Sequence, residues 1–178
     1  MYTGELVRLR AYRKEDLELA TKYINGAEVR QYIELGVPFL YTMHNEEEWY
    51  EKISPFEKEY NFAIEVLDKE EYIGGCGIHN IDYKNSKVEI GIFIGNEEYL
   101  SKGYGTDALK VLVKFIFEQM NINKVKLTVF DFNDRAKRCY EKVGFKVEGI
   151  LKDEVFRNGK YRDVIQMCIF KKDYFKED

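Results

Sequence analysis

The stretch Leu100-Ser101-Lys102-Gly103-Tyr104-Gly105-Thr106 places two glycines between a strand-like segment and a helical one. The apolar, alternating run Lys87 to Gly95 precedes it, and a long helical pattern, Asp107 to Met120, follows it. Glycine lacks the Cβ that disfavours positive φ, so this loop can curl sharply before the helix. The curled amides and the first free N–H groups of the helix then form a site suited to phosphate. The stretch therefore predicts a β-loop-α unit that can bind a phosphate.

A tight turn without a ligand is the alternative, and a lone Gly-x-Gly favours it. The chain has no Gly-x-x-x-x-Gly-Lys-[Ser/Thr] motif, which excludes a Walker A loop. Ala108 stands where a dinucleotide-binding loop has its third glycine, and the preceding strand belongs to an antiparallel run. The choice between the turn and the phosphate site therefore depends on the rest of the chain.

The bulk composition predicts one domain spanning residues 1–178. The chain is 45% hydrophobic and 34% charged, with a net charge of −4. This charge argues against a nucleic-acid-binding protein, which would show a basic surface. No apolar run reaches the about 20 residues that span a bilayer, and no secretory signal is recognisable, so the expected location is cytoplasmic. Three widely spaced cysteines and two histidines favour reduced thiols and disfavour a metal site.

Hydrophobic periodicity predicts a mixed α/β domain, of the α+β kind, with a mostly antiparallel central sheet flanked by helices. The expected strands alternate apolar and polar residues: 5–10, 61–67, 71–81, 87–95, 124–130, 146–156 and 160–170. The expected helices carry apolar residues three and four apart: 14–25, 28–37, 45–53, 107–120 and 133–143. Asn158-Gly159 predicts a hairpin turn. Asn45 and Asn133 are expected N-caps, and Gly144 is an expected helix end. In helix 107–120 one narrow stripe is expected to meet water: Asp107, Lys110, Lys114 and Glu118.

A second stretch gives the loop its context. It reads Asn133-Asp134-Arg135-Ala136-Lys137-Arg138-Cys139-Tyr140-Glu141-Lys142-Val143-Gly144-Phe145. The pattern Asn-x-x-Ala-x-x-x-Tyr-x-Lys-x-Gly-Phe, together with the loop at 100–106 in this order and separation, resembles the GNAT superfamily of N-acetyltransferases. The tail from Phe145 to Met167 is most similar to the branch that holds bacterial spermidine N-acetyltransferases and the ribosomal-protein N-terminal acetyltransferases.

The resemblance implies a GNAT fold that uses acetyl-CoA as cosubstrate and no metal ion. It also implies direct attack by a primary amine, which belongs to a polyamine or to a protein or peptide N-terminus. The implied cofactor site comprises Ile92, Phe93, Ile94, Ser101, Lys102, Gly103, Tyr104, Gly105, Thr106, Asn133, Tyr140 and Lys142. Leu100 departs from the family pattern, which often has Gln or Arg there, and Lys102 is expected to supply some of the missing positive charge.

Two side chains are candidates for the catalytic steps. The resemblance makes Tyr140 the general acid toward the CoA thiolate, while a tyrosine packed on the sheet is the alternative. Glu89 shares a strand face with the small Gly91, so it is a candidate base for the incoming ammonium, directly or through water. A charge held by a neighbouring Lys or Arg explains Glu89 equally well. Backbone N–H groups near Phe93 are the expected oxyanion donors.

The region that binds the acceptor is the least defined by the sequence. Glu46-Glu47-Glu48 and Glu51 would attract a cationic acceptor, although the sequence favours a solvated helix face. Four other residues are candidates for lining the acceptor slot: Tyr32, Glu34, Phe39 and Tyr41. A non-catalytic acyl-CoA-binding or regulatory module on the same fold is the alternative function, and the presence of both Asn133 and Tyr140 favours catalysis. The aromatic content of 15% and the final hairpin permit a homodimer or higher homo-oligomer.

Overall fold

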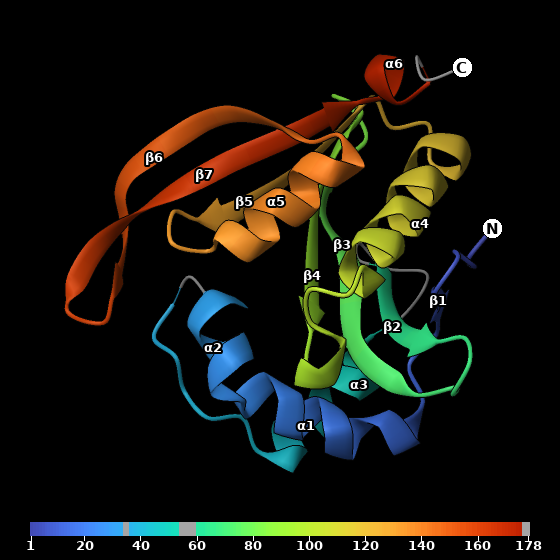
Figure 1. The fold of residues 1–178 in the computed structure, drawn as a ribbon, viewed down its shortest axis with the longest axis vertical. Helices are drawn as coiled ribbons and strands as arrows, with labels where there is room; N and C mark the ends of the chain where they lie inside the picture. Colours follow the sequence, from blue (N-terminus) through green and yellow to red (C-terminus); the bar gives the residue numbers. More distant parts are fainter. Residues whose placement is uncertain (34–35, 54–59, 176–178) are drawn as a thin grey trace.

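A seven-stranded sheet forms the centre of the fold (Figure 1). The computed structural model describes residues 1–33, 36–53 and 60–175. The strands are β1 Val7–Arg10, β2 Tyr60–Val66, β3 Tyr72–Asp82, β4 Lys87–Ile94, β5 Lys124–Phe130, β6 Lys146–Arg157 and β7 Lys160–Phe170. They are arranged in the order β1-β2-β3-β4-β5-β7-β6, and only β4 and β5 are parallel neighbours. The predicted mixed, mostly antiparallel sheet is confirmed.

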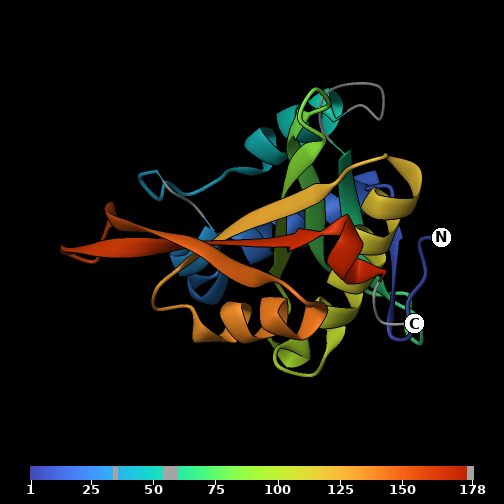
Figure 2. The ribbon, with the colours of Figure 1, turned by 90° about the horizontal axis from the view of Figure 1, so that it is seen from above.

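Helices cover both faces of this sheet. They are α1 Leu17–Asn25, α2 Ala27–Ile33, α3 Met43–Lys52, α4 Tyr104–Gln119, α5 Asp134–Val143 and α6 Lys171–Tyr174, with 3-10 turns η1 Lys14–Asp16 and η2 Glu97–Tyr99. Ile64 of β2 packs in the core with α4, whereas Ala63 packs with α1 on the opposite face. Figure 2 shows α3 and α5 on opposite sides of the sheet. No helix in the described part of the chain is long and apolar enough to cross a bilayer.

Local sequence signals set most of the element ends. Asn133 Oδ1 accepts a hydrogen bond from Ala136 N at 3.1 Å and so caps α5, as predicted. Gly144 ends α5 with a φ of 104°. The turn residues Asn158 and Gly159 have φ values of 52° and 77°, the left-handed pair that a tight hairpin turn requires.

Three predictions about helices need correction. Thr42, rather than Asn45, caps α3: its Oγ1 accepts from Asn45 N at 3.3 Å, while Asn45 Oδ1 accepts from Thr42 N at 2.9 Å. Helix α4 begins at Tyr104, three residues before the predicted start, so the last three residues of the glycine loop belong to its first turn. The helix expected over 28–37 is α2, which is described to Ile33; residues 34 and 35 lie outside the described part of the chain, and residues 36 and 37 are not helical.

Asp107 is buried, although helical periodicity placed it on the solvent-facing stripe of α4. Its carboxylate accepts hydrogen bonds from three consecutive backbone N–H groups, those of Glu5, Leu6 and Val7, at 3.1, 2.8 and 3.0 Å. Because Asp107 lies in the first turn of α4, the helix dipole also favours its negative charge. The carboxylate therefore anchors the segment that enters β1 to the start of α4.

We expect Asp107→Asn to lower the free energy of unfolding by about 2 kcal/mol, because the buried, charged acceptor of three backbone N–H groups is replaced by a neutral amide. Urea unfolding followed by circular dichroism measures the change. Glu118→Gln, at an exposed position of the same helix, is the matched control and should stay within about 0.5 kcal/mol of the parent protein. Equal stability of the Asp107 variant and the control would contradict the anchoring role.

Candidate active site

The pairing between β4 and β5 stops partway along the strands. It comprises Lys87 with Lys124, Val88 with Val125 and Glu89 with Lys126, and no later residue of β4 pairs with β5 among the described residues. In Figure 1 the two strands diverge beyond this point. The far half of β4 thus leaves one of its hydrogen-bonding edges unpaired within the sheet.

The backbone N–H groups of β4 point alternately toward β3 and toward this gap. Gly95 N donates to Ile73 O of β3 at 2.8 Å. Because groups two residues apart point to the same side of a strand, the N–H of Phe93 also faces β3. The N–H groups of Ile92 and Ile94 consequently face the gap, so the gap donors are the neighbours of Phe93 rather than Phe93 itself.

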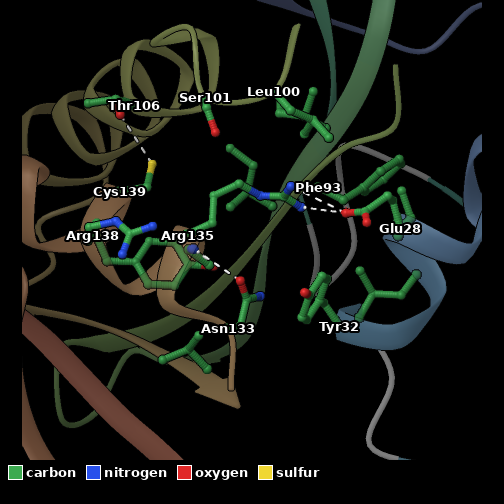
Figure 3. Close-up of a pocket in the computed structure, with 18 of the residues that line it drawn as sticks. Glu28, Tyr32, Phe93, Leu100, Ser101, Thr106, Asn133, Arg135, Arg138 and Cys139 are labelled. Atoms are coloured by element: carbon green, nitrogen blue, oxygen red, sulfur yellow. Dashed lines mark hydrogen bonds and ion pairs between the residues drawn. The ribbon is translucent and has the colours of Figure 1, made fainter. Parts of the chain in front are cut away.

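A first cavity, of about 350 Å³, lies at this gap between α2, β4, the glycine loop, β5 and α5. Figure 3 shows Ser101 and Thr106 on one wall and Tyr32 and Asn133 on another. Ten of the twelve residues in the predicted cofactor site line it: Ile92, Phe93, Ile94, Ser101, Gly103, Gly105, Thr106, Asn133, Tyr140 and Lys142. Leu100, which departs from the family pattern, also lines it.

The other two predicted residues, Lys102 and Tyr104, are not among the described residues that line this cavity. Lys102 is exposed, and the ring of Tyr104 packs against that of Tyr99 with 4.8 Å between centroids. Ser101 and Gly103 have φ values of 60° and 96°, which produces the predicted curl of the loop. The N–H groups of the first turn of α4 have no acceptor within the helix, and their residues Gly105 and Thr106 line the cavity.

Three cations of α5 line the same cavity, and only Lys142 among them belongs to the cofactor site predicted from the sequence. The residues are Arg135, Arg138 and Lys142, with successive spacings of three and four residues, which place them on one helix face. Arg135 forms an ion pair with Glu28 of α2 at 3.3 Å, across the cavity mouth (Figure 3). No ion pair involves Arg138 or Lys142 within residues 1–33, 36–53 and 60–175. The spacing could have identified Arg138, but its direction toward the loop depends on how α5 packs.

A second cavity, of about 430 Å³, meets the first one at the gap. Tyr32 and Tyr41, two of the four candidates for lining the acceptor slot, line it. Phe39 is 75% exposed and is not among its described lining residues, and Glu34 lies outside the described part of the chain. No group of three or more His, Cys, Asp or Glu residues in the described ranges could hold a metal ion.

Tyr140 lines both cavities, so its phenol is positioned where they meet. Only 8% of the residue is exposed, and burial raises the pKa of its phenol, with a smaller contribution from Cys139. The phenol of Tyr140 therefore stays neutral throughout the physiological pH range. Its neighbour Cys139 also lines the first cavity, where its Sγ lies 3.2 Å from Thr106 Oγ1. Burial raises the pKa of this thiol, which keeps it protonated.

The structure separates Glu89 from the rest of the predicted site. Glu89 lines neither cavity among the described residues, and Asn80 Nδ2 donates to its Oε2 at 3.4 Å. At about 3.3 Å per residue it lies roughly 10 Å along β4 from Ile92. A general base acts within hydrogen-bond reach of the proton that it removes, or through one water. Glu89 therefore stays a candidate base, acting directly or through water, that the structure places outside both cavities.

Comparison with known proteins gives this arrangement a family. Residues 7–146 match the acetyltransferase (GNAT) domain. The chain is 33% identical over 177 residues to the spermidine N(1)-acetyltransferase of Escherichia coli strain K12. This alignment covers 99% of this chain and 92% of that protein. The crystal structure of spermidine N-acetyltransferase from Vibrio cholerae in complex with CoA and spermine superimposes with a TM-score of 0.85 at 29% identity, covering 96% of this chain and 98% of that one. The chain therefore belongs to the GNAT family of acetyltransferases.

Proposed function

We propose that this acetyl-CoA-dependent N-acetyltransferase transfers its acetyl group to a primary amine of a polyamine. The observation that carries the proposal is that Tyr140 lines both of two cavities that meet where β4 and β5 separate. Such an arrangement supports entry of the two substrates from different sides, with their reacting atoms beside one phenol. The similarity to a spermidine N-acetyltransferase solved with CoA and spermine supports the choice of polyamine.

The first cavity has the groups that CoA requires. Its glycine loop offers N–H groups at the start of a sixteen-residue helix, and Arg138 and Lys142 supply positive charge for phosphates. The N–H groups of Ile92 and Ile94 are suited to the amide-containing pantetheine arm and to the acyl oxygen. Acetyl-CoA supplies the activated acyl group as a thioester.

The residues around the gap would then act in sequence. The free amine forms the new C–N bond at the acyl carbon while the C–S bond breaks, and the surplus proton on nitrogen leaves to solvent. A gap-facing N–H of β4 would stabilise the negative charge that develops on the acyl oxygen. Tyr140 would donate its proton to the departing sulfur and recover one from solvent. No cysteine nucleophile takes part in this scheme.

A panel of amines tests the proposal. CoA release is measured with acetyl-CoA and spermidine, spermine, Ala- or Ser-initiated peptides, and simple monoamines. The expected result is the highest kcat/KM with a polyamine. Preference for a peptide would contradict the polyamine assignment, and binding of acetyl-CoA without turnover of any amine would favour a non-catalytic acyl-CoA-binding module.

Gly105 tests the glycine loop. A methyl group added here would contact Ile94 and Cys139 at 3.6 and 3.9 Å, which are ordinary distances, so Gly105→Ala should fold normally. The methyl group occupies the cavity wall beside the free N–H groups. We expect acetyl-CoA to bind about tenfold more weakly, because a loss of this size corresponds to one charge-assisted hydrogen bond. Isothermal titration measures the affinity, with Gly149→Ala on β6 as the control. Unchanged affinity would contradict phosphate binding by this turn.

We also infer a cytoplasmic location and self-association. Free Cys76, Cys139 and Cys168 support a reducing compartment. Exposed apolar side chains on the projecting β6–β7 hairpin, including Phe156 and Tyr161 at 63% and 66% exposure, support a contact between copies.

A further inference from the structure

The second cavity is an aromatic chamber with one carboxylate. Tyr12, Trp49 and Tyr72 form part of its wall: the ring of Tyr12 lies 4.8 Å from that of Trp49 and 5.9 Å from that of Tyr72. Neither lysine nor arginine occurs among its described lining residues. Aromatic faces attract organic cations, most strongly where water is excluded.

Glu46 provides the carboxylate. It is the first of three consecutive glutamates on α3, which the sequence favoured as a solvated helix face. The structure shows instead that Glu46 is 7% exposed and lines the second cavity together with Trp49, one turn further along α3. Glu48 on the same helix is exposed. The packing of α3 therefore buries Glu46 in the cavity wall and leaves Glu48 at the surface.

The carboxylate of Glu46 has no hydrogen-bond donor or cation beside it among the residues that the structure describes. Burial raises its pKa, and no positive charge acts in the opposite direction. Its negative charge in turn contributes, after burial itself and Asp16, to raising the pKa of the Tyr72 phenol. A buried carboxylate without a partner is costly to the fold, and a cationic ligand in the cavity would remove that cost.

Glu46 and Tyr140 border the second cavity from two different helices. Tyr140 belongs to α5, and Figures 1 and 2 show α3 and α5 well apart, on opposite sides of the sheet. A chain with two amines is therefore suited to place one amine beside Tyr140 and the other beside Glu46.

On the basis of the proposed function, we propose that Glu46, within the aromatic wall of the second cavity, binds a second ammonium group of the acceptor and so determines specificity for amines with two or more positive charges. The attacking amine lies free and uncharged beside Tyr140. The distal amine stays protonated against the Glu46 carboxylate and the rings of Tyr12, Trp49 and Tyr72. Glu46 takes no part in proton transfer.

Glu46→Gln tests this role, with Glu48→Gln as a control that removes the same charge from an exposed position of the same helix. At saturating acetyl-CoA, spermidine is compared with pentylamine, which carries one amine. We expect Glu46→Gln to raise the KM for spermidine roughly 10- to 100-fold, the loss of one charge-assisted contact, with kcat within about twofold. The KM for pentylamine should not change, and Glu46→Asp should recover part of the spermidine affinity. The thermal midpoint of Glu46→Gln should equal or exceed that of the parent, because an unpaired buried charge is removed.

An unchanged KM for spermidine in Glu46→Gln would overturn the proposal, and so would an equal loss for spermidine and pentylamine. Calorimetric titration of spermidine into the parent protein and Glu46→Gln decides the question without turnover. If no amine is acetylated, the proposed function fails. In that case, weaker spermidine binding by Glu46→Gln than by the parent protein would still support the ammonium site. Equal binding by the two proteins would overturn it.

Discussion

Tyr140→Phe is expected to lower kcat by about 100- to 10,000-fold, the usual contribution of a positioned general acid. The substitution removes the phenolic hydroxyl and keeps the ring. The hydroxyl of Tyr140 forms no hydrogen bond with another described residue, so the substitution removes no structural contact of that group. The ring packs near Phe145, with 6.2 Å between centroids, and a phenylalanine retains that contact. Folding stability and acetyl-CoA affinity should therefore stay close to those of the parent protein.

Steady-state rates across a pH series provide the measurement. Burial holds the pKa of Tyr140 above the usual value of about 10, so the phenol keeps its proton across the assay range. The parent rate should therefore rise with pH as more of the amine becomes free, without an alkaline decline below pH 10 caused by Tyr140. Tyr83→Phe, at a 63% exposed position, is the matched control and should leave kcat unchanged. Full activity of Tyr140→Phe at every pH would contradict the general-acid role.

The second large effect is expected at Glu65, which is fully buried at the centre of an arginine cluster. Arg8 Nε and Arg10 Nε donate to the two carboxylate oxygens, and Arg13 Nη1 lies 3.4 Å from Oε2. Arg10 is held in turn by Asp16, through contacts of 2.7 and 2.8 Å. This network ties β1, β2 and the start of α1 together.

Glu65→Gln should lower the free energy of unfolding by about 3 kcal/mol, because it removes the fully buried carboxylate that Arg8 and Arg10 share and breaks both ion pairs at once. Urea unfolding followed by the fluorescence of the single tryptophan, Trp49, measures the loss. Glu70→Gln is the matched control: Glu70 also pairs with Arg8, at 2.9 Å, but its side chain is 72% exposed. An exposed pair of this kind contributes about 0 to 1 kcal/mol. Equal losses in the two variants would contradict the buried role of Glu65.

The difference in folding stability between the parent protein and Glu65→Gln should also depend on pH. Burial alone would raise the pKa of Glu65, but hydrogen bonds and charge from Arg10 and Arg8 outweigh it and hold the pKa below its usual value. A carboxylate with a lowered folded-state pKa stabilises the fold above its unfolded pKa, about 4.3, and loses that contribution as the pH falls through the folded value. The stability difference between the parent and Glu65→Gln should therefore be constant near pH 7 and shrink below about pH 4.

Local patterns in the chain were sufficient for most of the fold. Four features each depend on residues that are close in sequence, so they could be predicted from the sequence alone. These are the glycine loop, the Asn133 cap, the Gly144 helix end and the Asn158-Gly159 hairpin. The loop at 100–106 and the stretch 133–145 together indicated the family, because their spacing reflects one shared arrangement of strand, loop and helix.

Burial and long-range distance could not be read in the same way. Periodicity placed Asp107 at the surface of α4, but the chain entering β1 covers it and supplies three N–H donors. Nothing in the run Glu46-Glu47-Glu48 distinguishes its members, and only the docking of α3 turns Glu46 toward the second cavity. Glu89 shares a strand with the site, yet it pairs with Lys126 where β4 and β5 are still joined and lines neither cavity. A side chain's environment is formed by elements distant in sequence, which is why these three roles emerge only once the helices and strands are packed together.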